Sequence, residues 1–135
     1  IISQSLGLTP HAEDGLSEID CGELEGRDDA YSWGRYERVY DRWLKAEWDA
    51  RFVGGESLRE AYNRFADVLS KAAYDENALL VTHGGVTRSV VPRLCVNAAA
   101  LQRVSGLITT GLVVLSVYDP GRYSCESWNL KEHLN

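Results

Sequence analysis

The feature that most constrains the fold is an apolar run that ends in a histidine and two glycines and continues into a second apolar pattern, over residues 77–91. The continuous apolar stretch at 78–81 is typical of a buried parallel strand. His83 stands where that strand should end, and three valines recur at helical spacing after the two glycines. The pattern predicts a strand over 78–82, a short glycine turn and a helix.

A turn of this kind is suited to binding an anion. Open α/β sheets bind their ligands at the carboxyl ends of the strands, and a helix that begins there directs free N–H groups and its positive dipole end at the ligand. The alternative is structural, because a histidine beside glycines can cap a turn by hydrogen bonding to the backbone. This stretch alone leaves both interpretations open.

Composition limits the partners and the compartment. A length of 135 residues is usual for one domain, and the shares of 44% hydrophobic and 25% charged residues are ordinary for a globular protein. No apolar run approaches the roughly 18 residues of a membrane span and no signal peptide is visible, so we expect a cytoplasmic protein with no membrane partner. The net charge of −6 argues against nucleic acid as a partner, but it allows a small phosphorylated ligand in a local basic pocket.

Cysteine and histidine spacing predicts neither a disulfide framework nor a bound metal. The cysteines contain no Cys-x-x-Cys pair and are expected to be reduced, buried thiols. They are Cys21, Cys95 and Cys125. The histidines at positions 11, 83 and 133 show no metal-ligand spacing. We therefore predict that the chain uses no metal and no cofactor.

The first residues have the pattern expected of the last turns of a helix. Ile2 and Leu6 lie four residues apart, as on one helical face, and Gly7 is a natural stop. The sequence also contains no methionine. We expect residues 1–135 to form a single domain that is truncated at its N-terminus, the later part of a longer protein.

An acidic loop and an aromatic helix follow. Residues 11–26 carry six acidic side chains and three glycines, which predicts a loop whose carboxylates are mostly solvated, with one or two facing a site. From Asp28 the pattern is helical, and Trp33 and Trp48 at its ends are candidates for a pocket wall. Its apolar face is expected to lie in the core, and consists of Tyr36, Val39, Tyr40, Trp43 and Leu44.

Local signals predict three further elements. Ser57 and Glu60 fit the capping-box pattern, which predicts a helix over 58–73. The β-rich run at 112–118, a turn at 119–122 and the alternating run at 123–128 predict a hairpin. The helix after the two glycines is expected to end near Val96, and a short helical segment is expected around 98–104.

Three short motifs occur in a recognisable order. They are Leu-Ser-Glu-Ile-Asp-Cys-Gly-Glu-Leu-Glu-Gly at 16–26, Gly-Gly-Glu-Ser at 54–57 and Val-Thr-His-Gly-Gly at 81–85. Together they resemble the histidine phosphatase superfamily, which includes cofactor-dependent phosphoglycerate mutases and small-molecule phosphatases. The resemblance implies a three-layer α/β/α sandwich of the phosphoglycerate mutase-like type, incomplete at the N-terminus. It also implies metal-independent chemistry in which a phosphoryl group passes to a histidine and then to water or another hydroxyl.

The resemblance implies roles for individual residues. His83 is similar to the superfamily's second histidine, which contacts the phosphoryl group and stabilises its developing charge. Glu18 looks like the acid that protonates the leaving oxygen, and Gly84 would donate its backbone N–H to the phosphate. Glu56 and Ser57 match a recurrent Gly-Glu-Ser motif that we assign to helix capping and packing.

Residue chemistry alone does not single out these positions. It does not prefer Glu18 over Asp20, Glu23 or Glu25, and most loop carboxylates are simply solvated. Arg88, one turn into the helix after the glycines, adds positive charge near the site, and we expect it to pair with a neighbouring carboxylate.

The chain departs from the superfamily pattern, because it lacks both the Arg-His-Gly motif and a later arginine that precedes the first helix. The Arg-His-Gly motif, which carries the nucleophilic histidine and a phosphate-binding arginine, does not occur in the sequence. Neither His11 nor His133 stands in such a context. We therefore expect these 135 residues alone to be inactive. We also expect them to associate with the missing N-terminal segment or with a second chain, which would cover exposed sheet edges.

Three functions are compatible with these observations. The favoured one is a phosphatase that hydrolyses a small phosphomonoester through a phosphohistidine. The compact segment 27–53 looks more like that of the superfamily's phosphatases than that of its glycolytic mutases, which carry a longer insert. A cofactor-dependent phosphoglycerate mutase is the second. The third is a non-catalytic domain that keeps the fold as a binding or regulatory surface.

Overall fold

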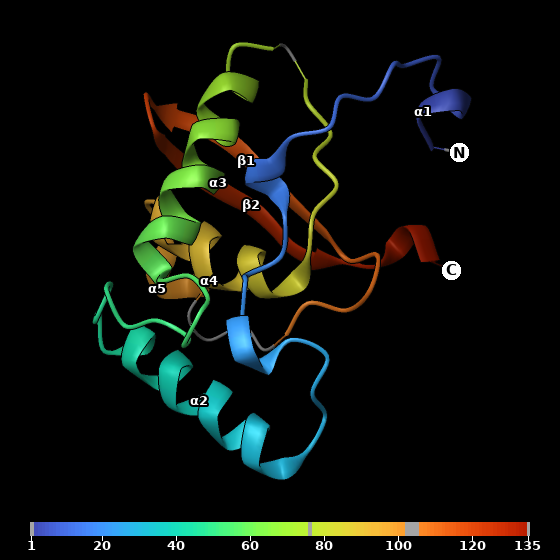
Figure 1. The fold of residues 1–135 in the computed structure, drawn as a ribbon. Helices are drawn as coiled ribbons and strands as arrows, with labels where there is room; N and C mark the ends of the chain where they lie inside the picture. The colour runs from blue at the N-terminus through green and yellow to red at the C-terminus, as the bar shows by residue number, and fades with distance from the viewer. Residues whose placement is uncertain (1, 76, 102–105, 135) are drawn as a thin grey trace.

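The computed structural model describes residues 2–75, 77–101 and 106–134, and Figure 1 shows their arrangement. The helices are α1 (Ile2–Ser5), α2 (Ala30–Leu44), α3 (Leu58–Ala72), α4 (Gly84–Leu94) and α5 (Ala98–Leu101). The strands are β1 (Leu112–Asp119) and β2 (Arg122–Leu130). Short 3₁₀ turns lie at η1 (Asp14–Leu16), η2 (Gly22–Leu24) and η3 (Glu132–Leu134). Within these ranges, no helix has both the length and the apolar character needed to cross a membrane.

Helix α2 carries the predicted aromatic stripe. Asp29 caps its start by accepting hydrogen bonds from the backbone N–H and hydroxyl of Ser32. Trp43 is buried and donates its indole N–H to the Ala50 carbonyl at 2.7 Å. Leu44 was expected in the core but is 63% exposed, because it is the last helical residue and the chain turns back to place Ala50 beside Trp43 instead.

Helix α3 begins at the predicted capping box. The Ser57 hydroxyl accepts from the Glu60 N–H, and the Glu60 carboxylate accepts from the Ser57 N–H at 2.7 Å. The helix ends at Ala72, one residue before the predicted end. Its buried face supplies Leu58, Ala61, Phe65, Val68 and Leu69.

The predicted hairpin forms, and it is fixed to the end of α4. Strands β1 and β2 pair antiparallel. The Val96 N–H donates to the Tyr123 carbonyl at 2.8 Å, and the Asn97 side-chain amide exchanges two hydrogen bonds with the backbone of Cys125. The short helix expected around 98–104 is present as α5, and residues 102–104 lie outside the described residues.

The strand expected over 78–82 is the main error of the sequence prediction. These residues form no ladder, and Leu79 and Val81 are 55% and 74% exposed. A strand requires neighbours that bond to its N–H and C=O groups. Among the described residues the sheet consists of β1 and β2 alone, so nothing pairs with this segment.

Helices and hairpin share one hydrophobic core, in keeping with the predicted α/β class. Trp43 of α2, Phe65 of α3, Val90 of α4 and Tyr123 of β2 belong to the same buried cluster. Figure 1 shows α3 crossing in front of the hairpin, α4 and α5 lower in the view, and α2 below them. The N-terminal end of α4 therefore lies close to both the acidic loop and α2.

Candidate active site at the start of helix α4

Helix α4 begins directly after His83, as the glycine turn predicted. His83 is the N-cap residue and is exposed, and its carbonyl accepts from the N–H and hydroxyl of Thr87 at 3.2 and 2.7 Å. The first N–H groups of a helix have no partner within the helix, and they carry the positive end of its dipole. The turn thus presents an anion-binding helix end beside an imidazole.

The Glu18 carboxylate occupies this helix end. Its oxygens accept from the N–H groups of Gly85 at 2.9 Å and Val86 at 2.6 Å, and from the N–H of the adjacent Ile19 at 3.0 Å. The approach is close, because a Cβ atom added at Gly85 would lie 2.7 Å from a Glu18 oxygen. The structure therefore brings Glu18 and the backbone of His83 and Gly84, three residues chosen from sequence, to one place.

Long-range contacts hold the acidic loop in position. The Arg64 guanidinium on α3 uses all five of its N–H donors: two bond to the Glu56 carboxylate, and three to the carbonyls of Gly15, Ser17 and Glu18. Glu56 in turn accepts from the Asp20 N–H at 3.0 Å. Ser57 has its expected role as helix cap, whereas Glu56 connects α3 to the loop. Sequence reasoning missed Arg64, because no local pattern marks it.

The other loop carboxylates bond elsewhere. Asp20 accepts from the Gly22 N–H at 2.8 Å, Glu23 pairs with Arg35 at 3.1 Å, and Glu25 accepts from the Cys21 N–H at 2.7 Å. Glu18 is thus the carboxylate of this group that reaches α4, a distinction that sequence alone did not make.

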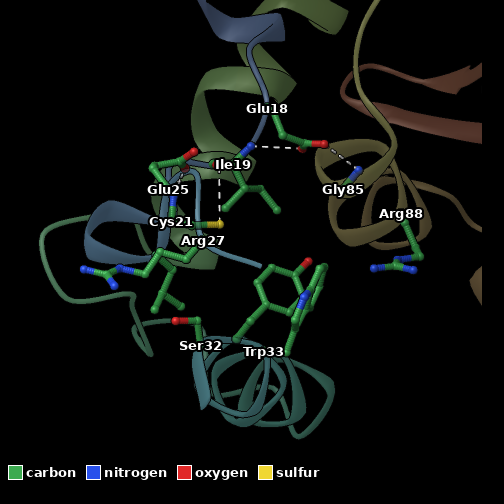
Figure 2. A pocket seen from close by; sticks show the side chains of 11 residues that line it. Glu18, Ile19, Cys21, Glu25, Arg27, Ser32, Trp33, Gly85 and Arg88 are labelled. Carbon is green, nitrogen blue, oxygen red and sulfur yellow. Dashed lines mark hydrogen bonds between the residues drawn. The ribbon is translucent and has the colours of Figure 1, made fainter. Parts of the chain in front are cut away.

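A cavity of about 450 Å³ opens beside Glu18, between the acidic loop, α2 and α4 (Figure 2). Trp33 lines it, as predicted for a pocket wall, together with Tyr36 on the same helix. Charged side chains face the same space, and they are Glu18, Glu25, Arg27 and Arg88. The size suits a small molecule. His83 and Gly84 lie at the helix end and do not line this cavity.

Two groups in the cavity have perturbed acidity. Burial, reinforced by the carboxylates of Glu25 and Glu18, raises the pKa of the Cys21 thiol to about 12. Burial also raises the pKa of the Tyr36 hydroxyl, and the Arg88 guanidinium opposes part of that rise. Both groups stay protonated at neutral pH, so neither adds negative charge to the cavity.

Arg88 does not form the expected salt bridge. Among the described residues no carboxylate pairs with it, and its guanidinium lies 5.0 Å from the centre of the Tyr40 ring. The Nε atom is buried without a hydrogen-bond partner.

The other two histidines do not line this cavity. The His133 ring lies 2.9 Å from the Thr110 carbonyl, and His11 is exposed. In the part of the chain that the structure describes, no three His, Cys, Asp or Glu side chains converge closely enough to hold a metal ion.

Comparisons with known proteins agree with the motifs. The family model of the histidine phosphatase superfamily (branch 1) matches residues 1–131. Phosphoglycerate mutase-like protein 4 of Arabidopsis thaliana is 31% identical over 84 residues, which make up 60% of this chain and 35% of the plant protein. Phosphoserine phosphatase 1 of Hydrogenobacter thermophilus is 29% identical over 85 residues, 61% of this chain and 40% of the bacterial protein. The chain thus spans well under half the length of these two relatives.

Solved structures share the fold. The mycobacterial glucosyl-3-phosphoglycerate phosphatase in complex with inorganic phosphate superposes with a TM-score of 0.73 at 20% identity, over 96% of this chain and 69% of that one. The alpha-ribazole phosphatase of Shigella flexneri superposes with a TM-score of 0.66 at 19% identity, over 96% of this chain and 65% of that one.

Proposed function

The chain belongs to the histidine phosphatase superfamily, and we propose that its protein hydrolyses a small phosphomonoester through a phosphohistidine. One observation carries the proposal. The Glu18 carboxylate bonds to the first N–H groups of α4, and the helix begins directly after His83, so the proposed acid, the anion-binding helix end and the backbone of His83 lie together. Phosphoryl transfer requires charge stabilisation and positioning above all, and these groups supply both.

We propose that the phosphoryl group of the substrate takes the place of the Glu18 carboxylate at the helix end. The N–H groups of Gly84 and Gly85 would then bind phosphoryl oxygens, and His83 would stabilise the charge that develops on them. Glu18, released from α4 but still held by its backbone, would lie beside the bridging oxygen and protonate the leaving alcohol.

The nucleophile must come from outside these residues. Members of the superfamily carry it in the Arg-His-Gly motif, which this sequence does not contain. We propose that the 135 residues alone form no phosphoenzyme. A further segment of the protein, or a second chain, would supply the nucleophilic histidine.

Relatives support the choice of hydrolysis. Their names include a phosphoserine phosphatase and a glucosyl-3-phosphoglycerate phosphatase, and we propose a substrate of comparable kind, a small phosphorylated metabolite. The plant relative named phosphoglycerate mutase-like favours transfer to a second hydroxyl as the alternative. A non-catalytic binding domain is the third possibility, and the experiment below separates all three.

The test is to trap the phosphoenzyme in the full-length protein with a ³²P-labelled phosphomonoester. We expect acid-labile label on histidine and release of inorganic phosphate, whereas an isomerised product would identify a mutase. Glu18→Gln should slow turnover of alkyl esters by about 10²- to 10⁴-fold, the usual contribution of general acid catalysis. Turnover without labelled histidine would refute the mechanism, and neither label nor turnover with a panel of phosphomonoesters would favour the binding domain.

A further inference from the structure

Trp33 is a large aromatic residue that lines the cavity beside Glu18 and is left largely uncovered. It is 55% exposed, and Figure 2 shows its side chain directed from α2 towards the acidic loop and α4. Single exposed aromatic residues are common on protein surfaces, so exposure alone does not indicate a ligand. The packing behind Trp33 supplies the second observation.

A series of aromatic contacts anchors Trp33 to the hydrophobic core. Its ring packs edge-on against Tyr36, with the ring centres 5.8 Å apart. Tyr36 stacks on Phe52 at 5.5 Å, and Phe52 packs edge-on against Trp43 at 5.4 Å. Phe52 and Trp43 are each 1% exposed. Trp33 is thus the outer member of an ordered aromatic array, and a ligand that binds to it loses little affinity to the ordering of this wall.

The rest of the cavity lining favours an apolar occupant. Ile19 and Leu24 of the acidic loop line the same cavity, and both belong to or pack against the hydrophobic core. The charged side chains that share the cavity balance in sign. They are Glu18, Glu25, Arg27 and Arg88. Charge therefore gives no net preference for an anionic or a cationic group, whereas the apolar surface favours a hydrocarbon one.

The cavity lies where the leaving alcohol of the substrate would be. In the proposed mechanism the phosphoryl group binds the N–H groups at the start of α4, and Glu18 protonates the leaving oxygen. Glu18 and Gly85 also line the cavity. The carbon frame attached to that oxygen would therefore extend into the cavity and meet Trp33.

We propose that the cavity binds the leaving alcohol, and that Trp33 selects alcohols whose carbon frame is a ring with a flat apolar face. The proposal rests on the proposed function and names its substrate class. Contacts between flat rings are favourable beyond the apolar area that they bury, and an ordered wall adds selectivity for shape. An aromatic ring and the C–H face of a pyranose both present a surface of this kind.

The first test compares three primary alkyl phosphates in the full-length protein. They are 2-phenylethyl phosphate, glucose 6-phosphate and ethyl phosphate, which all leave as primary alcohols and so need similar protonation. We expect kcat/KM to favour at least one ring ester over ethyl phosphate by about 10-fold or more. Trp33→Ala should remove most of that preference and leave ethyl phosphate nearly unchanged. The identity of the preferred ester distinguishes an aromatic ring from a sugar.

Two variants serve as controls. Tyr31→Ala removes another aromatic ring from α2, but Tyr31 is 70% exposed and does not line the cavity, so the preference should not change. Trp33→Leu keeps apolar bulk without a flat ring and should also lose most of the preference, which gives a result even where Trp33→Ala does not fold. Equal kcat/KM for the three esters in the wild type would overturn the proposal. An equal loss on all three in the Trp33 variants would also overturn it, because Trp33 would then support the site without recognising the ring.

A binding measurement tests the inference apart from catalysis. The full-length protein, with ¹⁵N in its tryptophan indoles, is titrated with 2-phenylethanol, with glucose and with ethanol. We expect at least one ring alcohol, and not ethanol, to shift the indole N–H signal of Trp33, which is identified by its absence from the Trp33→Leu spectrum. A ring-dependent shift in a protein that turns over no phosphomonoester would refute the proposed function and keep the ring-binding role of Trp33. Turnover with no ring-dependent shift would refute that role and keep the proposed function.

Discussion

Glu18 illustrates how much of this site depends on single residues. Its carboxylate satisfies two N–H groups of α4 that have no partner within the helix. The same N–H groups are the natural site for a phosphoryl group. The resting structure thus holds the proposed acid in the place of the substrate, and any change at the contact with Gly85 should affect catalysis more than folding.

Gly85→Ala tests this point. The added methyl group would lie 2.7 Å from the flexible end of the Glu18 side chain, so the carboxylate must move while the backbone stays. We expect activity on alkyl phosphates to fall by about 10²-fold or more, as for loss of a general acid. The free energy of unfolding should change by less than about 1 kcal/mol, because alanine also favours the helix.

Gly34→Ala in α2 is the matched control for that variant. A Cβ atom at Gly34 meets nothing within 4 Å, so activity should be unchanged. Activity is measured with an alkyl ester and stability by urea unfolding. A Gly85→Ala protein with full activity would show that the position of the Glu18 carboxylate is irrelevant to turnover.

At the scale of elements, α3 is the support of the acidic loop. Arg64 and Glu56 are 23% and 13% exposed, and their ion pair connects the helix to loop carbonyls 46 to 49 residues earlier in the chain. Paired, largely buried ions of this kind position structure more reliably than they stabilise it. The geometry of Glu18 therefore depends on α3, although α3 lends no side chain to the cavity.

Arg64→Lys should displace the loop without removing charge. Lysine cannot reproduce the five donors, so we expect turnover of alkyl phosphates to fall about 10-fold or more. Turnover of p-nitrophenyl phosphate should fall much less, because its leaving group needs no protonation. Arg59→Lys on the same helix is the control, since Arg59 pairs with the exposed Asp49 and exposed pairs contribute little. Equal losses on both esters would contradict a role in positioning the acid.

The capping box of α3 gives a stability prediction. Ser57→Ala should lower the free energy of unfolding by about 0.5–2 kcal/mol. The Ser57 N–H, its hydroxyl and the Arg51 guanidinium lower the pKa of Glu60 to about 2 from 4.5. A lowered pKa contributes stability above pH 4.5 that is lost as the pH falls towards 2, so the variant should lose less stability over this range.

Ser70→Ala, the same chemical change in the last turns of α3, is the control for Ser57→Ala. The Ser70 hydroxyl bonds to the Asp67 carbonyl within the helix, so a small effect is expected. Both variants are compared by urea unfolding at several pH values. Equal effects in the two variants would show that the cap contributes nothing beyond an ordinary serine.

At the scale of the whole molecule, thiols with raised pKa values make the free energy of unfolding depend on pH in the alkaline range. Burial raises the pKa of Cys21 to about 12 and that of Cys95 to about 11, from 9.0. Cys95 is buried in the core at the junction of α4 with β2, whereas the half-buried Cys21 packs against the core beside the cavity. The folded state therefore disfavours the ionised form of both thiols.

Stability should accordingly fall between pH 9 and pH 12. A raised pKa gives stability that is full below pH 9, where both states keep their protons, and is lost as the unfolded chain alone releases them. Each thiol adds at most about 1.4 kcal/mol per pH unit to this slope, and less for the half-buried Cys21. The double variant Cys21→Ser/Cys95→Ala should flatten the slope measured by urea unfolding. An unchanged slope would show that the thiolates are tolerated in the fold.

The sequence by itself determined the features that depend on neighbours along the chain. The cap at Ser57, the helical periods and the hairpin turn involve residues a few positions apart, so pattern and propensity predict them. The three motifs likewise identified the family from the sequence. The strand expected over 78–82 failed for the opposite reason, because a strand exists only through its neighbours.

Only the tertiary structure decided which carboxylate reaches α4 and which arginine holds the loop. Glu18 bonds to residues 67 and 68 positions away, and Arg64 bonds to carbonyls 46 to 49 positions away. Contacts between residues so far apart in sequence depend on how the helices and loops pack together. The periodicity of the sequence does not predict that packing.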